Sequence, residues 1–246
     1  MYLKKINKIF LILFIFIGFS YGADKDAGKV SFGFVQTSGN SETTTVKGAL
    51  SYTNKGDIYR IYIDASALYG SSKGEKNAEE IKLKTRFERR FLPLFIFWDI
   101  NYYRNPFKGY NQSLGTGPGV GVYILNNDKL YLTLSYYVYR VINKLTDKYS
   151  SSDIDNKTER YYQHHIEERF KWKILPNLSL KEKLIYKITS RAKEDYFVDL
   201  YTAIESKITD RLSLEISYTV NYQNRPVGKK IKRTDTIFMT GIKYSF

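Results

Sequence analysis

The sequence predicts an all-β fold, a transmembrane up-and-down antiparallel β-barrel of about 12 strands, from three observations. Segments long enough to cross a bilayer alternate between apolar and polar side chains along most of the chain. Tyr and Phe, which favour strands, occur 23 and 15 times, yet the mean hydropathy is only -0.40, which excludes a bundle of apolar transmembrane helices. The last segment ends on an aromatic residue that belongs to its apolar face.

The first 22 residues have the pattern of a secretory signal peptide. Lys4, Lys5 and Lys8 precede an apolar run over residues 9–19, and Ser20 and Gly22 are small residues at the positions that signal peptidase inspects. The run is shorter than the roughly 20 residues that a membrane-spanning helix needs, which disfavours the alternative of an uncleaved anchor. We therefore expect cleavage after Gly22 and a barrel domain over residues 23–246, exported to the bacterial outer membrane.

Composition narrows the partners that can be expected. The absence of Cys excludes disulfides, thiolate catalysis and zinc-thiolate sites, and no cofactor is expected. The formal net charge of +14 would suit nucleic acid, anionic lipid or an acidic solute. Because no nucleic-acid motif accompanies the charge, we expect outer-membrane lipid and lipopolysaccharide, the barrel-assembly machinery and a small anionic solute as the candidate partners, and no nucleic acid.

The first three expected strands are residues 29–37, 42–52 and 57–69. The first two flank a Thr-Ser-Gly-Asn-Ser turn, in which Gly and Asn tolerate the positive φ angles of a tight reversal. In the third strand, apolar side chains alternate with Arg60 and Asp64. Charged side chains meet lipid at a high cost, so this second face predicts a polar barrel interior.

The fourth segment, residues 79–91, fits two patterns. Leu83, Phe87 and Phe91 are four residues apart, as on one face of a helix. The strand pattern fits more residues, because nearly all the apolar side chains share one parity while charged side chains occupy the other; Arg89 alone breaks it. We expect Arg89 to reach the membrane interface near a strand end.

The middle of the chain continues the alternation. After a turn at residues 92–93, strands are expected at 94–102, at 113–124, and from 130 to the longest loop at 143–157. The sixth strand carries four glycines on its inner parity, Gly115, Gly117, Gly119 and Gly121. Such a row allows sharp curvature or a bulky group opposite, and we expect it to make space for neighbouring aromatic side chains.

The remaining expected strands are residues 160–174, 178–191, 194–208, 212–224 and 234–246. The connections near residues 55, 92, 127, 176 and 210 are tight, whereas those near 74, 108, 150, 192 and 229 tend to be longer and more polar. Short periplasmic turns and longer outer loops have this asymmetry, which places both termini on the periplasmic side.

Three stretches carry a family resemblance: Thr37-Ser38-Gly39-Asn40-Ser41, Gly117-Pro118-Gly119-Val120-Gly121, and the end from Thr234 to Phe246. In this order and spacing they resemble the salt-induced outer-membrane proteins of the YdiY type, a domain-of-unknown-function family, over nearly all of the chain after residue 22. The resemblance implies an outer-membrane β-barrel without an established activity, and it offers no catalytic residues.

The inward parity collects more cations than carboxylates. The expected lumen basic cluster consists of Lys82, Lys84, Arg86, Arg90, Arg169, Lys171, Lys173, Lys181 and Lys183. Mixed charges in a narrow barrel can form an ion-paired plug, and a positive excess can instead make a narrow, weakly anion-preferring pore. The sequence leaves both interpretations open, together with a purely structural or stress-related envelope barrel.

An enzyme acting on lipid or lipopolysaccharide is the sharpest alternative function. It would need a Ser, a His and an orienting polar group at a strand rim. His164 and His165 are adjacent in one strand, so His164 is expected to face outward and His165 inward, and no hydrolase motif accompanies them. We predict no catalytic residues and no enzymatic activity.

Two pairs of carboxylates lie outside the expected lumen. Glu168 and Glu182 have the parity of the apolar face, so either they face lipid near mid-membrane at some cost or a β-bulge turns them inward. We expect the bulge, or a polar contact with a partner barrel. Asp153 and Asp155 belong to the longest loop, and we expect them to be solvated. A metal site is weakly indicated at either place, and none is predicted.

The last segment, residues 234–246, is expected to close the barrel by pairing with residues 29–37 and 212–224. Its alternation puts Phe238, Tyr244 and Phe246 on the apolar face. Tyr244 and Phe246 form the expected assembly signal, because outer-membrane barrels end on such a strand.

Overall fold

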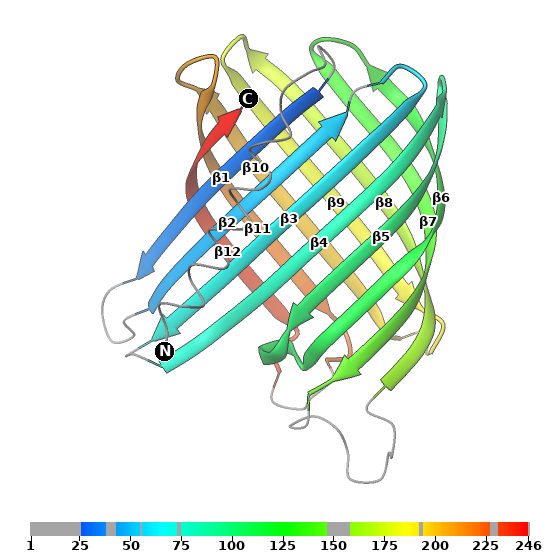
Figure 1. Cartoon of the computed structure of the whole chain (residues 1–246), viewed down its shortest axis with the longest axis vertical. Coiled ribbons are helices and arrows are strands. Elements are labelled where there is room, and N and C mark those ends of the chain that lie inside the picture. Colours follow the sequence, from blue (N-terminus) through cyan, green and yellow to red (C-terminus); the bar gives the residue numbers. More distant parts are fainter. Residues whose placement is uncertain are drawn as a thin grey trace.

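A computed structural model closes twelve antiparallel strands into one barrel, which confirms the predicted fold class (Figure 1). It describes residues 26–37, 43–54, 56–72, 75–146, 158–191, 194–226 and 231–245. The expected signal peptide, Asp153, Asp155 and Phe246 lie outside these residues. The strands of the first half are β1 (Asp26–Thr37), β2 (Thr43–Asn54), β3 (Tyr59–Ser72), β4 (Glu75–Phe91), β5 (Leu94–Asn105) and β6 (Tyr110–Asn126). Those of the second half are β7 (Leu130–Leu145), β8 (Thr158–Leu175), β9 (Leu178–Thr189), β10 (Tyr196–Lys207), β11 (Leu212–Gln223) and β12 (Thr234–Ser245).

Each strand pairs with its neighbours in sequence, and β12 returns to β1. The closing seam runs from Lys29 opposite Ser245 to Phe34 opposite Thr240, and β12 also pairs with β11 from Leu212 opposite Tyr244 onward. Both predicted partners of the last strand are therefore confirmed. Complete closure leaves no free sheet edge along the paired length, which is what a β-structure in a bilayer requires.

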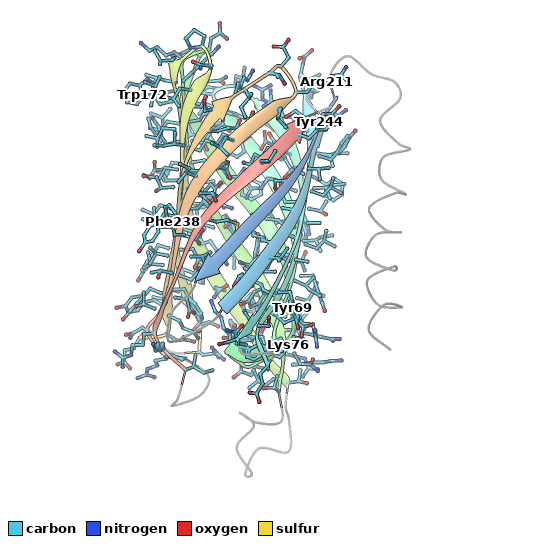
Figure 2. All side chains as sticks on the ribbon, turned by 90° about the vertical axis from the view of Figure 1, so that its left-hand side faces the viewer. Tyr69, Lys76, Trp172, Arg211, Phe238 and Tyr244 are labelled. Atoms are coloured by element: carbon cyan, nitrogen blue, oxygen red, sulfur yellow. The ribbon has the colours of Figure 1, made fainter. Side chains whose placement is uncertain are left out.

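The outer surface of the barrel is apolar, as the alternation predicts. Phe238 is 59% exposed, Trp98 50% and Tyr244 44%, although each is a large hydrophobic side chain. In Figure 2, Trp172 and Tyr244 lie near one end of the barrel, Tyr69 lies near the other, and Phe238 lies between them. Aromatic side chains at both ends of an apolar band are typical of barrels in a membrane. Separately, no helix in the described part of the chain is long and apolar enough to cross a bilayer.

The two ends of the barrel differ in their connections. One end, here called the tight-turn end, has turns such as Leu92–Pro93 and Pro176–Asn177. The first residues of β1 and the last residues of β12 lie at this end. The other end, the long-loop end, carries the 3-10 helix η1 (Pro106–Lys108) and the connections around residues 150, 192 and 229. The prediction of a longer loop near residue 74 is wrong, since β3 and β4 are separated only by residues 73–74.

Aromatic side chains fill part of the barrel interior against β6. The buried cluster contains Phe95, Phe97, Tyr123, Tyr137, Tyr139, Val141 and Tyr161. A Cβ at Gly119 would collide with the ring of Phe97, and one at Gly121 with the ring of Phe95. The prediction that these glycines make space for aromatic side chains is confirmed. Gly117 differs, because a Cβ there would collide with the backbone carbonyl of Val138.

Candidate functional site

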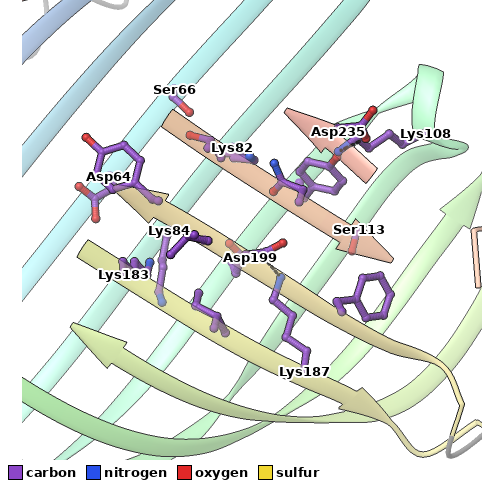
Figure 3. A pocket seen from close by; sticks show the side chains of 18 of the residues that line it. Asp64, Ser66, Lys82, Lys84, Lys108, Ser113, Lys183, Lys187, Asp199 and Asp235 are labelled. Carbon is purple, nitrogen blue, oxygen red and sulfur yellow. Dashed lines mark hydrogen bonds and ion pairs between the residues drawn. The ribbon is translucent and has the colours of Figure 1, made fainter. Parts of the chain in front are cut away.

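A cavity of about 610 Å³ occupies the lumen (Figure 3). Its lining begins at the long-loop end with Lys108, Arg233 and Asp235 and follows β12 as far as Lys243, two residues before the end of that strand. The cavity therefore extends along most of the length of β12, from the long-loop end towards the tight-turn end.

The cavity is bordered by small side chains on one side of the lumen and by large rings on the other. On β1, β2, β3 and β12 the lining includes Ser31, Ala49, Ser51, Ser66 and Gly241. On the opposite side, β5 and β7 contribute the large rings of the aromatic cluster. The small side chains on one side leave a volume unfilled, whereas the rings fill the lumen on the other side.

The lining carries more positive than negative charge. Its basic residues are Lys47, Lys82, Lys84, Lys108, Lys183, Lys187, Lys232, Arg233 and Lys243, and its acidic residues are Asp64, Asp199, Glu215 and Asp235. Several of these are paired: Lys187 with Asp199, Lys108 with Asp235 and Lys243 with Glu215. Among the described residues, Lys47 makes no ion pair. An excess of cations in a passage with low-dielectric walls attracts anions.

A buried ion-pair network lies behind the wall of the cavity. Arg86 donates two hydrogen bonds to Asp99, from Nε to Oδ1 at 2.8 Å and from Nη2 to Oδ2 at 2.9 Å. Arg169 Nε donates to Glu167 Oε1 at 2.6 Å, and Arg86 Nη1 lies 3.4 Å from the same oxygen. The side chains of Asp99 and Glu167 are completely buried. Charges this deep in a protein persist only when they are paired and hydrogen-bonded.

Tyrosines complete the network. Tyr139 Oη donates to Asp99 Oδ2 at 2.6 Å, and Tyr137 Oη donates to Glu167 Oε2 at 3.1 Å. The guanidinium carbon of Arg86 lies 3.7 Å from the centre of the Phe97 ring, a cation–π arrangement. The network and the aromatic cluster thus form one ion-paired plug on the β4–β8 side, while the cavity stays open beside it.

The residues of the expected lumen basic cluster divide into three groups. Lys82, Lys84 and Lys183 line the cavity. Arg86 and Arg169 belong to the buried network. The others lie nearer the tight-turn end: Lys171 and Lys173 are exposed, Lys181 pairs with Glu205, and Arg90 stacks over Tyr123. Of the nine cations expected in the lumen, three therefore line the cavity.

Several cations of the cavity are missing from the expected cluster. Lys47 could have been found, because Val46 and Leu50 on the same strand face outward and so predict an inward Lys47. Lys108, Lys232 and Arg233 lie in connections between strands, where alternation gives no information.

The two histidines lie on opposite faces of β8, as expected. Tyr136 Oη lies 2.7 Å from Nδ1 of His164 on the outer face. His165 stacks on Tyr137 and Tyr139 at centroid distances of 4.4 and 4.5 Å, and neither of its ring nitrogens has a hydrogen-bond partner among the described residues. A catalytic base held by a neighbouring nucleophile would show such a bond, so the geometry lends the enzyme alternative no support.

The prediction that a β-bulge turns Glu168 and Glu182 inward is wrong. Pairing between β8 and β9 is regular from Gln163 to Lys173, and the irregularity comes only after Lys173. Both carboxylates therefore stay on the outer face, where Thr202 Oγ1 donates to Glu182 Oε2 at 3.4 Å. No group of acidic, His or Cys side chains suited to a metal ion occurs in the described part of the chain.

Comparisons with known proteins agree with this architecture. A family model described as "Protein of unknown function, DUF481" matches residues 30–246, and no curated protein matches the sequence. Among solved structures, the chain is similar to the COG4313 outer membrane channel from Pseudomonas putida F1, with a TM-score of 0.52 and 10% identity over 89% of this chain and 94% of that one. It is also similar to the NanC porin, with a TM-score of 0.55 and 8% identity over 88% of this chain and 98% of that one. These likenesses show the fold of an outer-membrane barrel, and the family match confirms the resemblance to the YdiY-type proteins.

Proposed function

We propose, for a chain that belongs to the DUF481 family of proteins of unknown function, an outer-membrane channel that passes small anions in preference to cations. The observation that carries the proposal is the cavity in the lumen, which follows β12 from Asp235 to Lys243 and is lined by nine basic and four acidic residues. The ion-paired plug fills the lumen on one side, and the cavity runs along the small side chains opposite. The channel and porin named above have the same kind of barrel.

Reversal potentials in planar bilayers test the proposal. Under a KCl gradient, the wild-type protein is expected to conduct with chloride more permeant than potassium. Lys47→Glu is expected to shift the reversal potential towards potassium, because Lys47 faces the cavity without an ion-pair partner among the described residues. Lys129→Glu changes the same charge in an exposed turn and is the matched control. Folded protein without conductance, or an equal shift in both variants, would exclude an anion-preferring lumen.

A purely structural barrel is the second candidate, and the plug is the observation that favours it. The fully buried carboxylates of Asp99 and Glu167 and the buried guanidinium group of Arg86 link strands β4, β5 and β8 across the lumen, and Arg169 adds an ion pair within β8. A closed lumen in the bilayer experiment would favour this function. The enzyme alternative has no comparable support, since the outward His164 contacts a tyrosine and the inward His165 lies between aromatic rings.

The remaining expectations concern the envelope. We propose that the signal peptide of residues 1–22 is cleaved, that the tight-turn end faces the periplasm, and that lipid and lipopolysaccharide surround the apolar face. Induction by salt stays a prediction that follows from the family resemblance alone.

Deletion of Phe246 is expected to lower the amount of barrel assembled in the outer membrane strongly, while the barrels that do insert conduct normally. The reason is that a terminal aromatic on a lipid-facing strand serves as a signal for the assembly machinery. Heat-modified gel mobility of outer-membrane fractions measures the assembled amount. Phe238→Ala, which removes an exposed aromatic side chain from β12, is the control. Normal insertion of the deletion variant would show that Phe246 is not part of an assembly signal.

A further inference from the structure

We propose that Lys84, Lys183 and His165 form a binding site, at the wall of the cavity, for a small oxyanion that presents two charged oxygens, such as phosphate or a dicarboxylate. Lys84 comes from β4, His165 from β8 and Lys183 from β9, and all three line the cavity. This site deepens the anion channel proposed above and rests on it for the route by which the anion arrives.

The ammonium groups of the two lysines lie near the same carboxylate oxygen, but neither forms a hydrogen bond with it. Lys84 Nζ lies 3.7 Å and Lys183 Nζ lies 3.6 Å from the same atom, Glu167 Oε2, and both distances exceed a hydrogen bond. Lys84 also lies 3.1 Å from Asp99 Oδ2. Each ammonium group carries three N–H donors, so donors on both lysines remain available on the cavity side. Figure 3 shows Lys84 and Lys183 close together from different strands.

The neighbouring carboxylates are already occupied by stronger partners. Glu167 accepts hydrogen bonds from Arg169 and Tyr137, and Asp99 accepts two from Arg86 and one from Tyr139. With Arg86, Arg169, Lys84 and Lys183, the network has four cations around two carboxylates. The two lysines are the members that border the cavity, so the surplus positive charge faces it.

His165 supplies an independent indication of a ligand. Its side chain is 3% exposed, and both ring nitrogens lack a hydrogen-bond partner among the described residues. The hydroxyl groups of Tyr137 and Tyr139, on which the ring stacks, are directed at Glu167 and Asp99 instead. A buried imidazole of this kind costs free energy unless a further group accepts its N–H, and an oxyanion held by the two lysines would do so.

Two nearby acids set the position of the anion. Asp64 on β3 is the direct cross-strand neighbour of Lys84 on β4. It forms no ion pair with any described residue, so it repels an anion from the β3 side. Asp199 is neutralised by Lys187, which is the direct cross-strand neighbour of His165. We therefore place the anion on the β8–β9 side of the cavity, where Lys183 and His165 contribute to the lining.

Titration of the detergent-purified protein with inorganic phosphate, succinate and chloride tests the site by calorimetry. Wild type is expected to bind phosphate or succinate and not chloride, and the comparison of the first two identifies the source of the charged oxygens. Lys183→Gln is expected to weaken binding about tenfold or more, the effect of losing one charge-assisted hydrogen bond. His165→Phe keeps the stacked ring but removes the N–H, and it is expected to weaken binding less; His164→Phe on the outer face is the matched control.

The outcomes separate the site from the channel. Binding of phosphate or succinate no tighter than chloride, or binding that survives Lys183→Gln unchanged, overturns the site even if the channel prefers anions. Binding that is lost in Lys183→Gln and kept in His164→Phe supports the site even if the protein does not conduct, in which case the channel alone is wrong. A folded His165→Phe variant with unchanged affinity removes His165 from the site.

Discussion

Glu167→Gln is expected to lower the free energy of unfolding by about 3–5 kcal/mol, the usual effect of removing one member of a buried ion pair. The carboxylate is completely buried and is contacted by Lys84, Arg86, Arg169 and Lys183. Glutamine keeps the shape but removes the charge, so four cations would then share the single carboxylate of Asp99. The guanidinium group of Arg86 is itself buried, so water screens its repulsion with the other cations only weakly.

Urea unfolding in lipid vesicles measures this effect. Trp98 and Trp172 both lie on the outer face, so their fluorescence reports the transfer from lipid to water. Glu194→Gln is the control, because Glu194 pairs with Arg225 at the exposed rim, where an ion pair contributes at most about 1 kcal/mol. An unfolding midpoint for Glu167→Gln equal to that of the wild type would mean that the network does not stabilise the barrel.

A second variant distinguishes lost charge balance from lost packing. In Glu167→Gln with Lys183→Met, one of the uncompensated cations is removed together with the carboxylate. Because Lys183 makes only a long contact to Glu167, its replacement alone is expected to cost little. The double variant is therefore expected to be more stable than Glu167→Gln, and a further loss would show that the cations are not the source of the instability.

Alternation along single strands predicted the fold because it is a local property. Each strand of the barrel has one lipid-facing and one lumenal side, so parity alone separates Leu83 and Phe87 from Lys84 and Arg86. The same local rule kept Glu168 and Glu182 on the outer face, and the predicted bulge failed because nothing in the register interrupts the pairing there. For these two residues the alternation of faces gives the correct orientation, although a carboxylate that faces lipid costs free energy.

The candidate site could be predicted only in part, because it depends on contacts across the lumen. Arg86 on β4 and Glu167 on β8 are not on neighbouring strands, and their 3.4 Å contact follows from how far side chains reach into the barrel. The sequence predicts that both face inward, but it does not predict that they meet. The cavity likewise depends on strands that are far apart in the sequence, since large rings on β5 and β7 lie opposite small side chains on β1 and β2.

Gly119→Ala is expected to destabilise the barrel by about 1–3 kcal/mol, as over-packing of a filled interior does. The new Cβ would collide with the ring of Phe97 and lie 2.6 Å from the Cβ of Tyr137. Neither ring can move far, because Phe97 packs on Phe95 and Arg86, and Tyr137 is held by its bond to Glu167. The same urea experiment measures the loss.

Gly48→Ala is the matched control and has the opposite expected sign. No atom lies within 4 Å of the position where its Cβ would be, so the change only reduces the backbone entropy of the unfolded chain. It is expected to leave stability unchanged or raise it by up to about 1 kcal/mol. If Gly119→Ala behaved like Gly48→Ala, the rings against β6 would be loosely packed and the glycines would not be there to admit them.

Relief of the collision tests the cause directly. Phe97→Leu alone is expected to destabilise, because it leaves a void in the aromatic cluster and removes the ring beneath Arg86. In Gly119→Ala with Phe97→Leu, the added methyl group enters space that the smaller side chain has vacated. The double variant is therefore expected to lose less stability than the sum of the losses in the two single variants. Strict additivity would place the strain of Gly119→Ala elsewhere, for example at Tyr137. Because Tyr137 also donates to Glu167, the packing against β6 would then act directly on the ion-pair network that borders the cavity.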